Sequence, residues 1–278
     1  MPWYPDLFSA PVLERIRGHA ADERAATPVP YFDGVRTGET DALVGSFAGE
    51  PEIHHPLRGR VKGLRAFAWF VAYTNSWLEE TNAVSDSVDR CITSQRGVEE
   101  IVLTLDGDDG RFELPVAIVA ERDDDERILE LRIYYSTWPL TGTHVNRPPL
   151  LQPDPDVVVP DVVDACQRAI AAGDAAAAVA AFEPDAYVRE PAGGPYVHRG
   201  ADEIRALYER FFSNGGGIAL EHCTVTDDGR ACALEYNVVR WGRSEFTPQA
   251  GIAIYVRGSS GRLAAARIYD DAGPPQSG

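Results

Sequence analysis

The sequence has little positive charge, few cysteines and no long apolar run. Its 278 residues include 26 Lys and Arg against 43 Asp and Glu, which gives a formal net charge of −17. Binding to nucleic acid or to an anionic membrane needs clustered Lys and Arg, so both partners are disfavoured. No apolar run reaches the roughly 18 residues of a membrane span, and the N-terminus lacks the basic and apolar regions of a signal peptide. We therefore expect a cytoplasmic protein.

The sequence also lacks the spacings of metal and cofactor sites. Its four cysteines form no CxxC pair, so free and mostly buried thiols are the favoured interpretation. Cys223 and Cys232 flank an expected hairpin turn, and whether they ever pair stays open. The acidic turns at 106–110 and 123–125 do not fit a twelve-residue calcium loop. There is no Gly-rich phosphate loop and no nucleophile elbow. We expect no metal and no cofactor.

The feature that organises the chain is a repeat at an offset of 135 positions, the separation of Phe47 from Phe182. Gly200 follows Gly63 by 137 positions, which a two-residue insertion explains. Several landmarks at one offset indicate a tandem duplication of one domain. The other landmark pairs are Gly38 with Gly173, Glu39 with Asp174, Pro56 with Pro191, and Arg132-Ile133-Tyr134 with Arg267-Ile268-Tyr269.

Hydrophobic periodicity predicts the same order of elements in both copies, helices first and then four strands. The first copy has expected helices at 31–48 and 64–78, an extended piece at 53–55, and strands at 83–94, 98–105, 112–121 and 128–137. The second copy has expected helices at 161–172, through Val179 and Phe182, and after Gly200, an extended piece at 186–190, and strands at 217–226, 231–240, 248–257 and 263–270.

This order of elements defines the expected domain organisation. Prolines disfavour a regular helix in the segment that connects the copies, and its apolar residues predict that it lies against the body of the protein. The expected parts are a helical arm at 1–28, a first domain at 29–138, the Pro-rich connecting segment at 139–160, a second domain at 161–272 and a disordered tail at 273–278.

Both copies resemble the NTF2-like superfamily, in its SnoaL-like and ketosteroid-isomerase-like branch. The second copy carries the pattern through Gly173-Asp174, Phe182, Glu190-Pro191, Gly200 and Arg267-Ile268-Tyr269-Asp270, and the first copy carries it more weakly. The resemblance implies an α+β fold with two tandem cone-shaped barrels, each a curved antiparallel sheet wrapped around helices. It also implies that domain 1 packs on domain 2 as an intramolecular pseudo-dimer, and a homodimer stays open.

Glu190 is the main catalytic candidate, because the resemblance places a proton-transferring carboxylate just before the proline. A carboxylate at the rim of an apolar cavity is partly desolvated, which raises its pKa toward the working pH. The alternative is a Glu that caps a turn or pairs with Arg189 or Arg199. His55 stands at this place in the first copy, as a base near neutral pH or as a buried polar group.

Tyr31 lies where isomerases of this branch carry a tyrosine that donates to the substrate oxyanion, and Cys166 is its equivalent in the second copy. The protonated Asp of those isomerases has no counterpart, because the stretches 116–118 and 252–254 are apolar. Neither copy therefore has the full oxyanion hole, which disfavours ketosteroid-type isomerisation.

Glu235 and Asn237 lie two apart on an expected strand, so they share one of its faces. Two polar groups in an apolar strand suggest a pocket wall, where Glu235 would form an acid/base pair with Glu190 like that of epoxide-opening cyclases of the superfamily. The alternative is a cross-strand salt bridge. Further substrate-binding candidates are Tyr208, His198, Trp69, Tyr73 and Arg267, of which the repeated Arg267 is more often structural.

These observations favour a cofactor-independent enzyme that acts on a hydrophobic small molecule by general acid/base catalysis. Isomerisation, cyclisation or epoxide opening in secondary metabolism is what the resemblance implies, with the main pocket in the second domain. The alternative is a non-catalytic small-molecule binding or scaffold protein.

Overall fold

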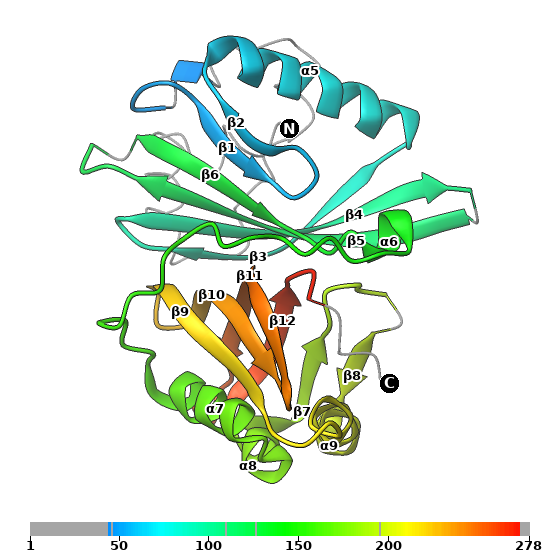
Figure 1. Cartoon of the computed structure of the whole chain (residues 1–278), viewed down its shortest axis with the longest axis vertical. Helices are drawn as coiled ribbons and strands as arrows, with labels where there is room; N and C mark the ends of the chain where they lie inside the picture. Colours follow the sequence, from blue (N-terminus) through cyan, green and yellow to red (C-terminus); the bar gives the residue numbers. More distant parts are fainter. Residues whose placement is uncertain (1–43, 46, 109, 126, 195, 273–278) are drawn as a thin grey trace. The chain divides into compact units, whose positions relative to one another are not determined.

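The structure is a computed structural model, shown in Figure 1. The expected helical arm, most of the expected helix at 31–48, and the expected tail lie outside the residues that it describes. The described residues are 44–45, 47–108, 110–125, 127–194 and 196–272.

The chain divides into two compact units, Met1–Ile133 and Tyr134–Gly278. The division groups the connecting segment at 139–160 with the second unit. The domain boundaries that the sequence suggests stay predictions.

The first unit combines a six-stranded sheet with the long helix α5 (Leu64–Glu80). This helix covers the expected range 64–78, lies across one face of the sheet in Figure 1, and buries Phe67, Phe70 and Leu78. The strands are β1 (Glu52–His55), β2 (Gly59–Lys62), β3 (Val84–Ile92), β4 (Arg96–Gly107), β5 (Gly110–Arg122) and β6 (Ile128–Tyr134).

The second unit repeats this plan with three helices on one face of a six-stranded sheet (Figure 1). The helices are α7 (Asp161–Ala172), α8 (Ala175–Ala180) and α9 (Gly200–Phe211), preceded by the short α6 (Trp138–Thr141). The strands are β7 (Phe182–Arg189), β8 (Val197–Arg199), β9 (Ile218–Asp227), β10 (Ala231–Trp241), β11 (Ser244–Arg257) and β12 (Leu263–Tyr269).

Both sheets are mixed, which corrects the expectation of antiparallel sheets. The strand orders are β2-β1-β6-β5-β4-β3 and β8-β7-β12-β11-β10-β9. Strand β1 pairs with β6 in parallel, and β7 pairs with β12 in parallel, whereas the other recorded pairs are antiparallel. The reason is connectivity: the four-strand meander ends beside the first strand, and its last strand runs in the same direction as that strand.

The two sheets share most of their register between equivalent strands, apart from the first strand pair, where the two-residue insertion shifts it. The pair Ile53↔Leu131 in the first unit corresponds to Val188↔Ala266 in the second at the 135-residue offset of the sequence repeat. A skipped residue in the pairing of the edge strand also occurs at equivalent positions of both sheets. The ladder skips one residue between Ser87 and Asp89, and the matching ladder skips one between His222 and Thr224.

Local sequence explains how α7 and α8 meet. Helix α7 ends at Gly173, which has a left-handed φ of 73° that a glycine adopts without strain. Asp174 then caps α8 by accepting a hydrogen bond from the backbone N–H of Ala177 at 2.9 Å. The Gly-Asp pair therefore turns the chain between the two helices.

The connecting segment lies against the second unit, as its apolar residues predict. The Leu151 carbonyl accepts from the Asn237 side chain at 3.1 Å, and the Arg147 carbonyl accepts from the Ala250 amide at 3.0 Å. The segment does contain a short helix, contrary to the expectation from its prolines. Pro139 sits in the first turn of α6, where the missing N–H has no helical partner to lose.

All four cysteines are buried thiols outside any disulfide, in agreement with the favoured interpretation. Within the described part of the chain, no helix combines the length and the apolar character that crossing a membrane requires.

Gly217, at the start of β9, is a position where the fold leaves no room for a side chain. A Cβ there would overlap the carbonyl oxygens of Ile170 and Ala171 at the end of α7. We predict that Gly217→Ala lowers the free energy of unfolding by at least about 2 kcal/mol, because rigid backbone must move. Urea unfolding measures it. Gly49→Ala is the control, since no atom lies within 4 Å of its added Cβ; equal stability of both variants would contradict the prediction.

Candidate active site

The second unit contains a cavity of about 370 Å³ between its sheet and its helices. Its wall is mostly apolar and rich in aromatic rings, with few polar groups, which is the usual character of a small-molecule pocket. The lining residues are Ser136, Trp138, His144, Ile170, Glu190, Pro191, Ala192, Tyr196, Tyr208, Arg210, Phe211, Ile218, Leu220, Tyr236, Val238, Trp241, Ala253, Tyr255, Ala266, Ile268, Asp270 and Ala272.

A carboxyl–phenol pair stands in the cavity wall where β12 ends. The Tyr236 hydroxyl donates to Asp270 Oδ2 at 2.8 Å, and the Ala272 amide donates to Oδ1 at 3.3 Å. Burial raises the pKa of Asp270 to about 6, against the lowering effect of the Tyr236 hydrogen bond. The Tyr236 ring can reach Asp270 because Gly251 lies between them. A Cβ on Gly251 would stand 2.6 Å from the ring and 2.7 Å from the Cβ of Asp270.

Glu190, the main candidate from the sequence, also lines the cavity. Its Oε1 accepts from His198 Nε2 at 2.6 Å and from Arg210 at 2.6 Å, so the carboxylate is held in place. Both bonds use the same oxygen, and the described residues offer no partner to Oε2. The structure thus brings Glu190 and His198 together at the cavity wall.

A buried chain of hydrogen bonds connects the cavity wall to α7. Gln167 Nε2 donates to the Tyr255 hydroxyl oxygen at 2.6 Å, and its Oε1 lies 3.2 Å from His222 Nε2. Tyr208 is hydrogen-bonded to Cys166, and burial raises the pKa of both groups, that of the Cys166 thiol to about 12. Tyr208 therefore lines the cavity as a neutral phenol, while Cys166 is an inert buried thiol.

Glu235 and Asn237 are not part of this cavity, which corrects the expected pairing of Glu235 with Glu190. They lie on the face of β10 opposite to Tyr236 and Val238, which line the cavity. Glu235 accepts from the hydroxyls of Tyr134 and Thr224, both at 2.7 Å. Glu235 and Asn237 do share one face of the strand, as the alternation predicts, but that face points away from the cavity.

Three candidates of the first unit lie around Arg58, whose guanidinium stands over the rings of Trp69 and Tyr73. His55 Nδ1 accepts from the amides of Leu57 and Arg58 at 3.2 Å, and its ring contacts Phe70. Trp69 and Tyr73 stack on each other on the outer side of α5 and are 55% and 43% exposed. Tyr31 lies outside the described residues.

Arg267 is buried and donates to the Tyr187 hydroxyl at 3.0 Å. It does not line the cavity of the second unit. Its strand neighbour at the cavity wall is Ile268, so Arg267 points to the opposite face of β12. This placement agrees with the structural role that its repetition suggested.

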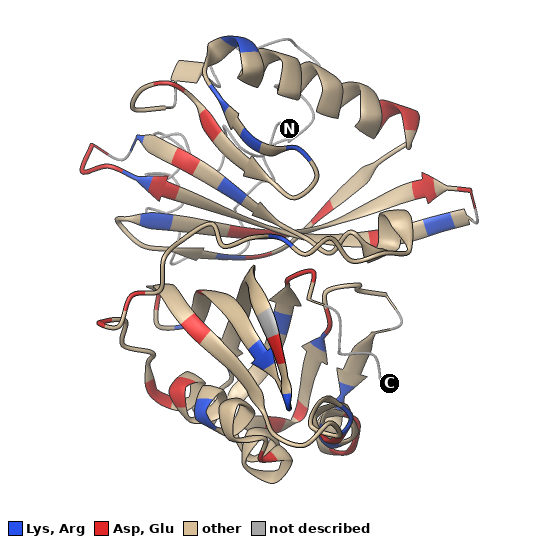
Figure 2. Ribbon diagram, viewed as in Figure 1, with Lys and Arg blue, Asp and Glu red and all other residues tan. Residues whose placement is uncertain are grey.

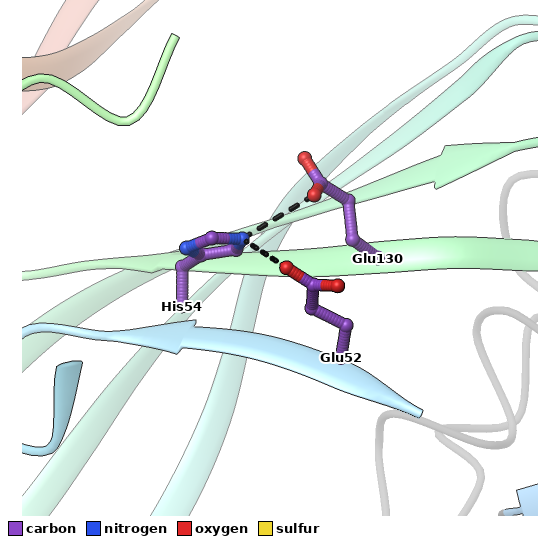
Figure 3. A group of neighbouring side chains, drawn as sticks. All are labelled: Glu52, His54 and Glu130. Atoms are coloured by element: carbon purple, nitrogen blue, oxygen red, sulfur yellow. Dashed lines mark hydrogen bonds and ion pairs between the residues drawn. The ribbon is translucent and has the colours of Figure 1, made fainter. Parts of the chain in front are cut away.

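Glu52, His54 and Glu130 come together on the sheet of the first unit and resemble a set of metal ligands (Figure 3). His54 Nε2 lies 3.2 Å from Glu52 and 3.3 Å from Glu130. Both carboxylates, however, already accept from cations.

Those cations lie on the neighbouring positions of β2 and β6, where charges of both signs stand side by side (Figure 2). Lys62 lies 2.8 Å from Glu52, Arg60 binds the same carboxylate, and Arg132 binds Glu130. The contact with Arg60 holds the pKa of Glu52 at about 2. A divalent ion would have to displace these side chains, so we interpret the group as an ion-pair ladder across the sheet.

Asp270 lines the cavity but is not among the site residues that the sequence suggests, although it ends the R-I-Y-D landmark. The signal was its position: an acid directly after the last apolar strand points to the end of the sheet, where the cavity lies. No sequence pattern indicates that Ser136, Trp138 and His144 line the cavity. They reach it from the segment between β6 and α7.

The raised pKa of Asp270 predicts how stability depends on pH. The folded protein holds the Asp270 proton up to about pH 6, whereas an ordinary Asp loses it near 3.8. Since the folded state binds more protons in this window, stability falls as the pH rises from about 4 to about 7, by about 2 kcal/mol. Asp270→Asn removes this contribution. Urea unfolding of both proteins at several pH values measures it, and parallel pH profiles would refute the raised pKa.

Comparisons with known proteins agree with the fold of the second unit. The SnoaL-like domain family matches residues 162–266. No curated protein matches the sequence.

Several solved structures are similar to part of the chain. A polyketide cyclase candidate from Sinorhizobium meliloti is 24% identical, and the match covers 40% of this chain and 94% of that one at a TM-score of 0.34. An NTF2-like protein of unknown function from Cytophaga hutchinsonii is 14% identical, with 42% and 94% covered and a TM-score of 0.33. A Catenulispora acidiphila protein with a ketosteroid isomerase-like fold, in complex with trimethylamine, is 17% identical, with 40% and 86% covered and a TM-score of 0.34. On the family match, residues 162–266 form a SnoaL-like domain of the NTF2-like α+β fold.

Proposed function

We propose that the second unit is a cofactor-independent enzyme that acts on a hydrophobic small molecule by general acid/base catalysis. The observation that carries the proposal is a carboxyl with a pKa of about 6 in the wall of an otherwise apolar cavity. Such a group exchanges protons efficiently near neutral pH, because both of its protonation states are populated there. The apolar wall favours a substrate whose own surface is apolar.

In this proposal two carboxyl groups, Asp270 and Glu190, have separate roles in proton transfer. Asp270, held by Tyr236, gives or takes a proton at the end of β12. Glu190 accepts a proton at Oε2, while Arg210 and His198 fix the position of its Oε1. An acid and a base in one cavity serve isomerisation, cyclisation and epoxide opening alike, since each reaction moves a proton to one atom and from another. Secondary metabolism is the setting in which we expect such a substrate.

We also infer that the chain is a tandem duplication whose copies differ in side-chain volume at equivalent positions of the described sheets. The shared register and the repeated irregularity of the ladder support the duplication. The cavity-lining Ala253 and Ala266 correspond at the offset of 135 to Ile118 and Leu131, which are 0% and 1% exposed. At these two places the first copy has larger side chains, which leave less space beside its sheet than the two alanines do. The pairing of the copies within one chain stays a prediction.

A non-catalytic binding protein is the second candidate, and the contacts of Glu190 favour it. An Arg and a His on one oxygen are what a structural carboxylate needs. The two functions differ in one measurable respect, since only an enzyme moves protons on its ligand.

Hydrogen–deuterium exchange tests the catalytic proposal without knowledge of the natural substrate. We would incubate the protein with 2-tetralone, an apolar bicyclic ketone, in D₂O and follow loss of its α-proton signal by NMR. We expect exchange well above the buffer rate, and a decrease of about a hundredfold or more in Asp270→Asn. Exchange at the buffer rate, with 2-tetralone still bound, would favour the binding protein.

The small residues of the cavity wall give a matched pair of variants. Ala266→Leu introduces the side chain of the first copy, so we predict that it fills the cavity and weakens binding of 2-naphthol at least about tenfold. The melting temperature should stay within a few degrees, since the added atoms occupy empty space. Quenching of Trp138 and Trp241 fluorescence measures binding. Ala171→Leu, on the exposed side of α7, is the control; equal binding by both variants would contradict the proposed site.

A further inference from the structure

The segment that follows β6 is fastened to the second unit by one buried carboxylate, Asp271. Its Oδ1 accepts from the Ser136 hydroxyl at 2.7 Å and the Thr137 amide at 2.9 Å. Its Oδ2 accepts from the Thr137 hydroxyl at 2.6 Å and the Val145 amide at 2.5 Å. Asp271 is only 5% exposed. Four donors from one short segment hold that segment over the end of β12, next to Asp270.

A histidine from the same segment reaches both Asp271 and the cavity. His144 lines the cavity, and its Nδ1 lies 3.1 Å from Asp271 Oδ1. Its ring stacks on Trp138 with the centroids 4.9 Å apart and the planes 25° from parallel. The carboxylate and the indole together fix the orientation of the imidazole.

This orientation determines where the imidazole carries its proton. An ionised carboxylate can only accept hydrogen bonds, so the nitrogen that faces Asp271 must be the N–H. The lone pair of the neutral ring is then on Nε2, which points away from Asp271. In the part of the chain that the structure describes, Nε2 has no hydrogen-bond partner. His144 lines the cavity and its side chain is 30% exposed, so a ligand in the cavity can replace water as the partner of Nε2.

We propose that His144 is a catalytic base of the cavity and that Asp271 is its positioning residue; the proposal rests on the acid/base function of the second unit. Nε2 takes a proton from carbon or oxygen of the substrate, and the electron pair of the broken bond stays on the substrate as an enolate or an alkoxide. The imidazolium forms beside Asp271, whose negative charge stabilises it. The same nitrogen returns the proton to a different atom, and the ring is neutral again. Where Asp270 supplies the proton instead, the imidazolium passes its own proton to solvent or to the ionised Asp270 carboxylate, which restores both groups.

A purely structural role for His144 explains the arrangement less well. Asp271 already holds the segment through four other donors, so the imidazole adds little to the fastening. His144 lies outside residues 162–266, so the family match assigns it no role.

The position of the imidazole proton is the first test, and it does not depend on activity. Nitrogen-15 NMR of histidine-labelled protein distinguishes the two neutral tautomers, and the His144→Gln variant identifies the signal. We expect the proton on Nδ1, and Asp271→Asn should shift it toward Nε2. Thr137→Val, which removes one fastening bond without touching the ring, should leave the tautomer as it is. A proton on Nε2 in the unaltered protein would overturn the proposal.

The exchange of 2-tetralone is the second test. We expect His144→Gln to lower the exchange rate by about fivefold or more while the affinity for 2-naphthol changes less than about twofold. A smaller decrease in rate overturns the role of His144 but leaves the acid/base function standing. Exchange at the buffer rate in the unaltered protein would contradict both the role of His144 and the acid/base function. The two failures therefore give different results.

Discussion

The alternation of side chains along β10, β11 and β12 is the constraint on which the cavity depends. One face of each strand supplies Tyr236, Ala253 and Ala266 to the cavity, and the other face carries Glu235 and Arg267. Because each strand can send only every second residue inward, the number of polar groups that the cavity receives is small. The carboxyl groups of the cavity wall therefore lie where strands end, at Glu190 after β7 and at Asp270 after β12.

Two adjacent acids show how much the end of a strand can separate neighbouring side chains. Asp270 points into an apolar cavity, where burial raises its pKa to about 6. Asp271 points the other way and accepts from the Ser136 and Thr137 side chains. One carboxyl is desolvated and can exchange a proton, while the other is surrounded by donors and orders a segment of chain. Their different environments, and not their residue type, give them different roles.

The sequence allows most of the fold to be predicted but only part of the site. Strand positions follow from alternation and turn residues, and the repeat defines equivalent positions in both sheets. The inward face of β10 could not be deduced, because both of its faces are buried and Glu235 is as inaccessible as Tyr236. Asp270 was visible only as a landmark. His144 could not be found at all, since its approach to the cavity depends on a contact across 127 positions with Asp271.

The distribution of side-chain volume between equivalent positions supports a division of roles between the proposed copies. Where the second unit has Ala253 and Ala266, the first has Ile118 and Leu131; where the second has Tyr236 and Tyr255, the first has Ile101 and Ala120. Aliphatic groups of middle size pack a stable core without voids. In the second unit, the small alanines leave space beside the sheet, and the tyrosine hydroxyls supply hydrogen bonds at the edge of that space. A packed core needs neither the space nor the hydroxyls. That exchange costs packing, which supports the proposal that a ligand fills the space.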